Sequence, residues 1–365
     1  MNSHDSVTEL VSVIIPAHNS ERFIAATLMS ALTQTHAALE VIVIDDGSTD
    51  ATAAIVDRFI ANDRRVRMIR QPQGGVARAR NRGIAEARGD YIAPLDADDL
   101  WHPEKIAEQL AVIRASANIG CVTTWCCRID VDGDILWEPR DSARWSGHVL
   151  PALLLEDFAG CASSPLLRRA CVLAVGGYDE SLRDRGAQGC EDYSLLLSIA
   201  ERYDFAVVPR PLTGYRLVPD SMSGNLWAML RSHDLVMARA RSRHPEIPPE
   251  VFRWARSGIC TWLATRAASA RMYGAMARLI VLVIRSDWLY FIHRLLRLGV
   301  RLCERALVSV RGGSAVKRRP FPEGLGEERH VLLPNWIASV LERHRLQACA
   351  GVAPVRPMTD AGPAH

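Results

Sequence analysis

Short apolar runs recur along the first hundred residues, and each is followed at once by polar residues. They lie at 11–15, 40–44, 66–69 and 91–95. Their length and their content of Val, Ile and Leu predict strands buried on both faces, as in a parallel sheet. We expect Pro16 to end the first strand, because proline has no N–H to donate to a sheet.

Apolar residues at helical spacing fill the stretches between these runs. They extend over 20–33, 50–61 and 76–87, and Ser20 is the expected N-cap of the first helix. This β-α-β-α order with short connections predicts an α/β fold, with a mostly parallel, Rossmann-like sheet flanked by helices. Ligands of such sheets bind beyond the carboxyl ends of the strands.

The order of elements is less regular after residue 100. We expect helices at 103–115, 149–158 and 195–200, strands at 121–124, 205–208 and 212–217, a hairpin around 132–133 and a mobile loop at 182–189. Together with the first hundred residues, these elements make a predicted catalytic domain at 1–224.

The charge divides the chain into two parts. Residues 225–365 carry 22 Lys and Arg against 10 Asp and Glu, whereas residues 1–224 carry 22 against 31. This asymmetry predicts an acidic catalytic domain and a basic, helical C-terminal extension, at 225–349, that meets something anionic. Residues 350–365 contain Pro and Gly but few apolar residues, and are expected to be disordered.

Within the extension, the apolar stretch at 276–310 is interrupted by arginines, which recur at helical spacing over 294–305. Its apolar run at 279–284 is too short to span a bilayer, which takes about 20 apolar residues. A helix lying in the membrane interface and a helical subdomain or oligomer contact are equally good interpretations. The sequence carries no nucleic-acid-binding signature, so a nucleic acid partner is not expected.

Composition places the chain among ordinary globular proteins. Its 365 residues are 48% hydrophobic and 23% charged. The nine cysteines form no Cys-x-x-Cys pair, so neither a zinc site nor a disulfide framework is expected. The polar, acidic start at 1–8 predicts no signal peptide. We therefore expect a cytoplasmic location, peripheral on the inner face of the cytoplasmic membrane if the extension binds lipid.

Three carboxylates, Asp96, Asp98 and Asp99, follow the fourth predicted strand. Alternate residues of an extended backbone point the same way, so Asp96 and Asp98 are expected to share a face. Two such carboxylates repel each other unless a cation lies between them. Oxygen ligands at a strand end suit Mg²⁺ or Mn²⁺ shared with substrate phosphates. An ordinary Asp-rich turn is the alternative.

Two common phosphate-binding devices are absent from the sequence. No Gly-x-Gly-x-x-Gly follows the first strand, and there is no Walker lysine loop. These absences argue against a dinucleotide enzyme and a P-loop kinase. A metal ion on Asp96 and Asp98 would take over the binding of phosphates.

Five segments, in order, resemble the motif set of glycosyltransferase family 2, whose members are inverting, nucleotide-sugar-dependent enzymes with the GT-A fold. They are 11–19, 43–50, 79–84, 95–99, and 176–180 with 191–193. The resemblance covers about residues 9–224. It implies a nucleotide-sugar donor, with a UDP-sugar favoured, and Mg²⁺ or Mn²⁺ as cofactor. It also implies a glycan or lipid-linked acceptor in the biosynthesis of cell-surface polysaccharide or glycoconjugate.

The resemblance implies a role for each matching residue. The implied donor-binding residues are Pro16, Ala17, His18, Asn19, Glu21, Asp45, Asp46, Gly47, Arg80, Asn81, Asp96, Ala97, Asp98 and Arg216. Among them, Asp46 would accept a hydrogen bond from the base, and Arg80 would lie near the diphosphate. Asp96 and Asp98 would hold the metal ion. His18 stands where tyrosine or phenylalanine is frequent, which leaves the donor base open.

Asp192, beside Glu191, is the implied general base for the acceptor hydroxyl. Adjacent carboxylates raise the pKa of one of them toward working pH. Alternatively, both acids only complement the dipole of a helix N-terminus. Two other classes stay open: a nucleotidyltransferase, which usually brings an early glycine-rich loop with basic residues, and an inactive glycan-binding or scaffold protein on the same fold.

Overall fold

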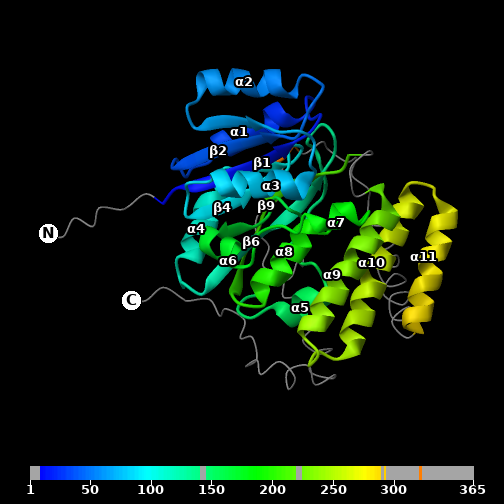
Figure 1. The fold of residues 1–365 in the computed structure, drawn as a ribbon. Coiled ribbons are helices and arrows are strands. Elements are labelled where there is room, and N and C mark those ends of the chain that lie inside the picture. Colours follow the sequence, from blue (N-terminus) through cyan, green and yellow to red (C-terminus); the bar gives the residue numbers. More distant parts are fainter. Residues whose placement is uncertain (1–8, 140–144, 219–223, 289–291, 293–319, 323–365) are drawn as a thin grey trace, which may run out of the picture.

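A mixed β-sheet runs through the molecule and carries helices on both faces (Figure 1). The computed structural model describes residues 9–139, 145–218, 224–288, 292 and 320–322. Its strands are β1 (Val11–Ala17), β2 (Leu39–Asp45), β3 (Val66–Arg70), β4 (Tyr91–Pro94), β5 (Leu100–Trp101), β6 (Ile119–Ile129), β7 (Ile135–Trp137), β8 (Leu166–Arg168) and β9 (Asp204–Arg216). Their order across the sheet is β3-β2-β1-β4-β8-β6-β9-β5, and β7 pairs with β6.

Helices separate most of these strands along the chain. They are α1 (Ile24–Leu32), α2 (Thr52–Asn62), α3 (Val76–Glu86), α4 (Lys105–Ile113), α5 (Leu150–Leu155), α6 (Arg169–Ala174), α7 (Ser181–Asp184), α8 (Glu191–Ala200), α9 (Leu226–Arg243), α10 (Pro249–Ser269) and α11 (Tyr273–Ser286). The predicted alternation of strands and helices over the first hundred residues is confirmed.

The N-terminal half of the sheet is parallel, as the apolar runs predict. β2 and β4 flank β1, and β3 lies outside β2, all in parallel register. Val13 and Ile15 of β1 belong to one hydrophobic cluster, and Ile14 between them belongs to the other. This alternation follows from the two-residue period of a strand. A strand buried on both faces therefore takes apolar residues at successive positions, as at 13–15 of β1.

β1 continues through Pro16 to Ala17, so the expectation that Pro16 ends the strand is wrong. Pro16 faces the same side of β1 as Ile14, whose carbonyl accepts a hydrogen bond from the backbone N of Leu95. The ladder with β4 ends at Pro94, opposite Ile14. The missing N–H of Pro16 lies beyond this ladder, so the strand loses no sheet hydrogen bond.

The C-terminal half of the sheet mixes directions. β8 is antiparallel to β4 and β6, β9 is parallel to β6, and β5 is antiparallel to β9. β9 is one continuous strand where two short strands were expected. The predicted hairpin is present, because β7 pairs with the end of β6. The segment expected to be a loop at 182–189 begins inside α7.

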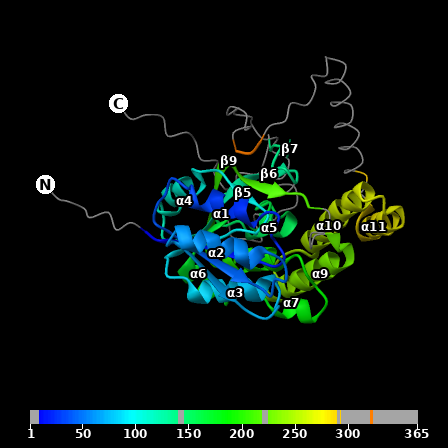
Figure 2. The same cartoon turned by 90° about the horizontal axis from the view of Figure 1, so that it is seen from above.

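Helices cover both faces of the sheet (Figures 1 and 2). α1, α2 and α4 contribute to the cluster of Val13, whereas α3, α6 and α8 contribute to that of Ile14. α1 begins after Phe23, so the prediction of Ser20 as its N-cap is wrong. The Ser20 carbonyl instead accepts hydrogen bonds from the backbone N of Phe23 and Ile24.

The helices α9, α10 and α11 lie together beside the sheet (Figure 2). Leu230, Leu263 and Leu279, one from each helix, belong to the same hydrophobic cluster as Leu195 of α8. The predicted helical extension is thus present as far as Ser286, while a domain boundary at 224 stays a prediction. The arginine-rich segment at 294–305 and the tail at 350–365 lie outside the described residues. In the described chain, no helix has the length and apolar content needed to cross a bilayer.

α3 approaches β1 closely at Gly83. A Cβ placed on Gly83 would lie 2.4 Å from Cγ2 of Ile14. We expect Gly83→Ala to lower the free energy of unfolding by about 1–3 kcal/mol, because the added methyl group would overpack the core. Chemical denaturation of both proteins measures this change.

Gly274→Ala is the matched control. Gly274 lies in α11, and a Cβ added there meets no atom within 4 Å. Alanine should leave the free energy of unfolding unchanged or raise it by up to about 1 kcal/mol. Equal destabilisation by both substitutions would contradict the close packing of α3 on β1.

Candidate functional site

The loops that follow β1 and β2 are cross-linked at the carboxyl ends of these strands. Asn19 Oδ1 accepts a hydrogen bond from the backbone N of Thr49 (2.8 Å), and Ser48 Oγ accepts one from the backbone N of Asn19 (3.1 Å). Glu21 Oε2 accepts a hydrogen bond from the backbone N of Ala51 (2.9 Å). The predicted donor-binding residues of the first loop are therefore fixed against the second.

The His18 ring is held between the second loop and the segment before α3. Its Nδ1 lies 2.9 Å from the carbonyl oxygen of Asp46, and its Nε2 lies 3.1 Å from Nε2 of Gln73. A carbonyl oxygen only accepts, so Nδ1 carries the hydrogen and Nε2 accepts from the Gln73 amide. The imidazole thus has a fixed orientation next to Asp46.

The buried carboxylate of Asp46 organises the loop before α3. Oδ1 accepts hydrogen bonds from Nε2 of Gln71 and the backbone N of Gly74, and Oδ2 accepts one from the backbone N of Gly75, all at 2.7 Å. A carboxylate has about four acceptor positions, so these three bonds leave room for one more. The contact with a donor base stays a prediction.

Asp45 and Gly47 shape the turn on either side of Asp46. Asp45 Oδ1 accepts a hydrogen bond from the backbone N of Ser48 (2.9 Å). Gly47 has φ +76°, and a Cβ on it would lie 3.1 Å from the backbone N of Gln73. Only glycine adopts this conformation without strain. Both residues act on the shape of the turn, and their contact with a donor stays a prediction.

Arg80 of α3 is a buried cation in contact with the turn after β4. Its guanidinium donates a hydrogen bond to Asp96 Oδ1 (2.5 Å) and lies over the Tyr178 ring, 5.2 Å from the centroid. Burial lowers the pKa of Arg80, but the charges of Asp96 and Asp192 outweigh it and keep the pKa above its usual value. Arg80 therefore stays charged among these acids.

The three acids after β4 have different surroundings. Asp99 is fully buried, and its carboxylate accepts hydrogen bonds from Ser163 Oγ (2.6 Å) and the backbone N of Arg216 (2.9 Å). Burial, and then repulsion from Asp96, raises the pKa of Asp98 to about 6. Asp99 thus serves the fold, whereas binding of a ligand by Asp96 and Asp98 stays a prediction.

Ser163, shortly before β8, supports this turn, and the sequence analysis missed this role. Its Oγ accepts a hydrogen bond from the backbone N of Asp96 (2.9 Å) while donating to Asp99. The carbonyl of Ala97 between them accepts a hydrogen bond from Thr27 Oγ1 (2.9 Å). A serine so far along the chain carries no pattern that would link it to residues 96–99. Only the pairing of β8 with β4 and β6 brings it there.

Arg216, at the end of β9, fastens the same turn from the other side. Its guanidinium donates to the carbonyls of Asp98 (2.6 Å), Asp130 (2.9 Å) and Val131 (2.9 Å) and lies over the Phe23 ring. Arg216 therefore clamps the turn to the β6–β7 hairpin. Its implied contact with a donor stays a prediction.

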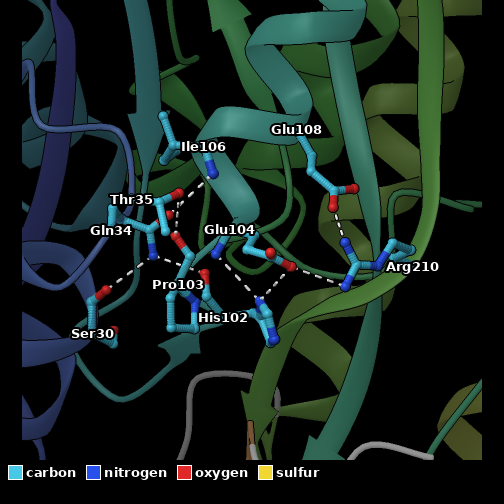
Figure 3. A network of polar contacts seen from close by, with 9 residues as sticks. All are labelled: Ser30, Gln34, Thr35, His102, Pro103, Glu104, Ile106, Glu108 and Arg210. Atoms are coloured by element: carbon cyan, nitrogen blue, oxygen red, sulfur yellow. Dashed lines mark hydrogen bonds and ion pairs between the residues drawn. The ribbon is translucent and has the colours of Figure 1, made fainter. Parts of the chain in front are cut away.

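A polar network anchors the chain just after the turn (Figure 3). Gln34, just after α1, donates to the carbonyl of His102 (2.8 Å), and Arg210 of β9 forms ion pairs with Glu104 and Glu108. These contacts tie the segment that leads into α4 to α1 and β9. The turn at 96–99 therefore lies between firmly held elements.

Glu191 and Asp192 form the first turn of α8, as the helix-dipole alternative expects, but they also lie near Arg80. Burial raises the pKa of Asp192, the Arg80 cation opposes this rise, and Asp96 adds to it. Glu191 is buried, and its Oε2 accepts a hydrogen bond from the backbone N of Gly189 (2.8 Å). Burial, with the Asp192 charge, also raises the pKa of Glu191.

Asn81 is fully engaged with the 176–180 segment. Its Oδ1 accepts a hydrogen bond from the backbone N of Tyr178 (2.8 Å), and its Nδ2 donates to the Tyr178 carbonyl (2.9 Å) and to Glu180 Oε1 (2.8 Å). In this structure Asn81 positions Tyr178, and the Arg80 guanidinium lies over the Tyr178 ring. Its implied contact with the nucleotide stays a prediction.

Asp157, in the loop after α5, is a further acid near Asp192 that the sequence analysis missed. Its side chain reaches solvent, yet enclosure by the surrounding protein and the charge of Asp192 raise its pKa to about 7. Tyr193 of α8 donates its hydroxyl to the carbonyl of Leu153 (2.8 Å), which holds α5 against α8. A lone acid in a loop gives no signal in the sequence.

Asp96 and Asp98 offer only carboxylate oxygens, the ligands that Mg²⁺ and Mn²⁺ prefer. The described residues contain no group of three or more His, Cys, Asp or Glu able to hold a metal ion. An ion on these two acids would thus take its other ligands from a diphosphate and water, as Mg²⁺ commonly does. Burial, and then the charge of Asp96, raises the pKa of Asp98, and a bound cation would favour its ionised form, so the residues fit the group.

Comparison with known proteins gives one family. The profile described as "Glycosyl transferase family 2" matches residues 12–154. Hyaluronan synthase of Pasteurella multocida is 36% identical over 203 residues, which are 55% of this chain and 20% of that protein. Chondroitin synthase of Pasteurella multocida (strain Pm70) is 36% identical over 246 residues, which are 66% of this chain and 24% of that protein. The chain thus spans less than a quarter of these curated relatives.

Solved structures show a similar fold. S. aureus TarS 1–349 in complex with UDP matches with a TM-score of 0.54 and 18% identity, over 77% of this chain and 83% of that chain. Mannosyltransferase PcManGT from Pyrobaculum calidifontis, in complex with GDP-Man and Mn²⁺, matches with a TM-score of 0.54 and 20% identity, over 78% and 88%. The predicted GT-A fold is confirmed.

Ser163→Ala tests how the turn after β4 is held. It removes the donor to the buried Asp99 and the acceptor of the Asp96 N–H. Because a buried carboxylate loses a partner, we expect the free energy of unfolding to fall by about 1–3 kcal/mol. Chemical denaturation measures the loss.

Ser242→Ala on α9 is the control, since Ser242 is exposed and donates only to the Arg239 carbonyl. We expect a change within about 0.5 kcal/mol. If both variants lose the same stability, Ser163 does not support the turn as described.

Proposed function

Because residues 12–154 match the family described as "Glycosyl transferase family 2", we propose that the protein transfers a sugar from a nucleoside diphosphate sugar to an acceptor hydroxyl, with inversion at the anomeric carbon. One observation carries the proposal most: the Asp96–Asp98 turn and the base candidate Asp192 both lie around the same buried cation, Arg80. This arrangement supports the transferase over the nucleotidyltransferase and over an inactive scaffold.

Transfer requires removal of a proton from the acceptor hydroxyl. Asp192 is the proposed general base, and burial raises its pKa so that it accepts a proton more readily than an exposed aspartate. Arg80 opposes this rise and keeps the carboxylate ionised. No second carboxylate needs to attack the sugar, so a direct displacement inverts the anomeric centre.

Transfer also requires that the negative charge of the leaving diphosphate be stabilised. Asp96 and Asp98 would hold a Mg²⁺ or Mn²⁺ ion, which acts as a Lewis acid toward that charge when bound. Asp96 keeps one oxygen on Arg80, so Asp98 is the more available ligand. The Ser163 and Arg216 contacts keep this turn in one conformation without a ligand.

The donor and acceptor follow from the names of similar proteins. TarS structures contain UDP and UDP-GlcNAc, PcManGT contains GDP-Man, and the curated relatives include hyaluronan and chondroitin synthases. These names support a nucleotide-sugar donor, with a UDP-sugar favoured, and a glycan or lipid-linked acceptor in polysaccharide biosynthesis. We place the reaction on the cytoplasmic side of the membrane, with the protein bound peripherally.

The two proposed roles predict different losses. We expect Asp192→Asn to lower kcat about 10²–10⁴-fold with donor binding kept, because only the proton acceptor is removed. Asp98→Asn should instead abolish the part of donor binding that depends on Mn²⁺. Release of nucleoside diphosphate from UDP-, GDP- and dTDP-sugars, with calorimetry of the donor in Mn²⁺ and in EDTA, measures both effects.

Asp132→Asn, in the exposed tip of the β6–β7 hairpin, is the control and should change neither value. A donor that turns over equally well in Asp192→Asn would rule out Asp192 as the base. Absence of donor binding by the unaltered protein with Mn²⁺ would overturn the transferase proposal itself.

The pH dependence tests the link between Arg80 and Asp192. kcat/KM of the unaltered protein should rise with pH until Asp192 is ionised. Arg80→Gln removes a charge that lowers the pKa of Asp192. The rising limb of kcat/KM should therefore move to higher pH.

Arg80→Lys keeps the charge and should move this limb less than Arg80→Gln. Arg82→Gln, an exposed change on the same helix, should leave it in place. A limb at the same pH in Arg80→Gln and in the unaltered, folded protein would mean that Arg80 does not set the ionisation of the base.

A further inference from the structure

α11 presents large apolar side chains to solvent. Tyr273, Val281 and Ile284 of this helix are 62%, 44% and 42% exposed, and Trp288 and Ile292 just beyond it are 60% and 42% exposed. We call Tyr273, Val281 and Ile284 the α11 surface. Isolated exposed apolar residues are normal, but a contiguous group indicates an interaction site.

The arrangement follows from helical geometry. At 100° per residue, Tyr273, Val281 and Ile284 lie within about 80° of one another around the helix. Leu279 and Val283 point the other way and are buried in the cluster that α10 shares. α11 therefore packs on the protein with one apolar face and presents a second to solvent.

Arginines border the exposed face. Arg278 and Arg285 follow Val281 and Ile284 around the helix and are themselves exposed. Residues 251–286 carry six arginines and no Asp or Glu. The next acid, Asp287, accepts a hydrogen bond from Nε1 of Trp254 (2.9 Å). The exposed face of α11 is thus both apolar and cationic.

We propose that the α11 surface docks on a lipid bilayer that contains anionic headgroups. Its apolar side chains would enter the boundary between headgroups and acyl chains, and Arg278 and Arg285 would reach the lipid phosphates beside them. Tryptophan side chains are enriched at the membrane–water interface, and Trp288 lies just beyond the helix. The charge argues against a second copy as the occupant, because two such faces would bring arginines against arginines.

This inference names the surface behind the peripheral binding proposed above, and it stands if the proposed glycosyl transfer fails. Docking through α11 involves none of the residues around Arg80. Such docking would hold the GT-A domain at the membrane surface through α11.

Binding of the full chain to liposomes tests the proposal. The probes are vesicles of phosphatidylcholine alone and of phosphatidylcholine with 30% phosphatidylglycerol, at low and high salt. We expect the protein to sediment with the anionic vesicles and to be released by salt, since each basic residue near such a surface contributes to binding. Protein that stays in the supernatant with anionic vesicles at low salt overturns the proposal.

Two double variants separate the apolar and charged contributions. Val281→Glu with Ile284→Glu, and separately Arg278→Glu with Arg285→Glu, should each lower the partition coefficient at least tenfold. Leu173→Glu on α6 and Arg58→Glu with Arg64→Glu near α2 change exposed residues elsewhere and should leave it unchanged. Circular dichroism and thermal unfolding confirm that each variant is folded.

Two results would overturn the assignment of this face. One is an equal loss of liposome binding in the α2 charge variant and the α11 charge variant. That result would mean that binding depends on the net charge of the protein and not on this face. The other is a dimer of the unaltered chain, seen by light scattering, that the α11 glutamates dissociate while liposome binding persists.

Discussion

The active-site candidate depends on one buried positive charge. A guanidinium removed from water is unfavourable unless anions and hydrogen bonds compensate it. Arg80 obtains this compensation from Asp96 at 2.5 Å, from the Tyr178 ring and from the charge of Asp192. These partners come from the end of β4, from the segment after α6 and from α8. The same charge balance that lets Arg80 be buried therefore brings the proposed metal ligand and the proposed base to one place.

The turn after β4 shows how adjacent acids take different roles. Asp99 points into the protein, where Ser163 and the backbone of Arg216 satisfy it. Asp98 has its pKa raised to about 6 by burial and by its neighbour Asp96. The inward acid fixes the turn, and the other two keep a repulsion that a divalent cation would relieve. A turn held by these contacts would be a preorganised site for a cation.

The sequence predicted the parts of this structure that depend on local pattern. Short runs rich in apolar residues predicted the parallel strands, and acids after strand ends predicted the turn at 96–99. It could not predict the mixed half of the sheet, because β8 has only three residues and its direction is set by its neighbours. Nor does a run of acids reveal that the Asp99 side chain is buried, or that a serine 64 residues later donates a hydrogen bond to it. Asn81 and Arg216 were assigned to the donor, but their observed contacts hold other segments in place.

The most direct test of this account is a crystal structure with UDP and Mn²⁺, in which anomalous scattering locates the metal. The account predicts a manganese peak about 2.0–2.3 Å from an Asp98 oxygen and from diphosphate oxygens, with Arg80 still bound to Asp96. It also predicts that the turn at 96–99 keeps its contacts with Ser163 and Arg216. A manganese peak away from Asp98, or Arg80 displaced from Asp96 to bind the diphosphate, would contradict it.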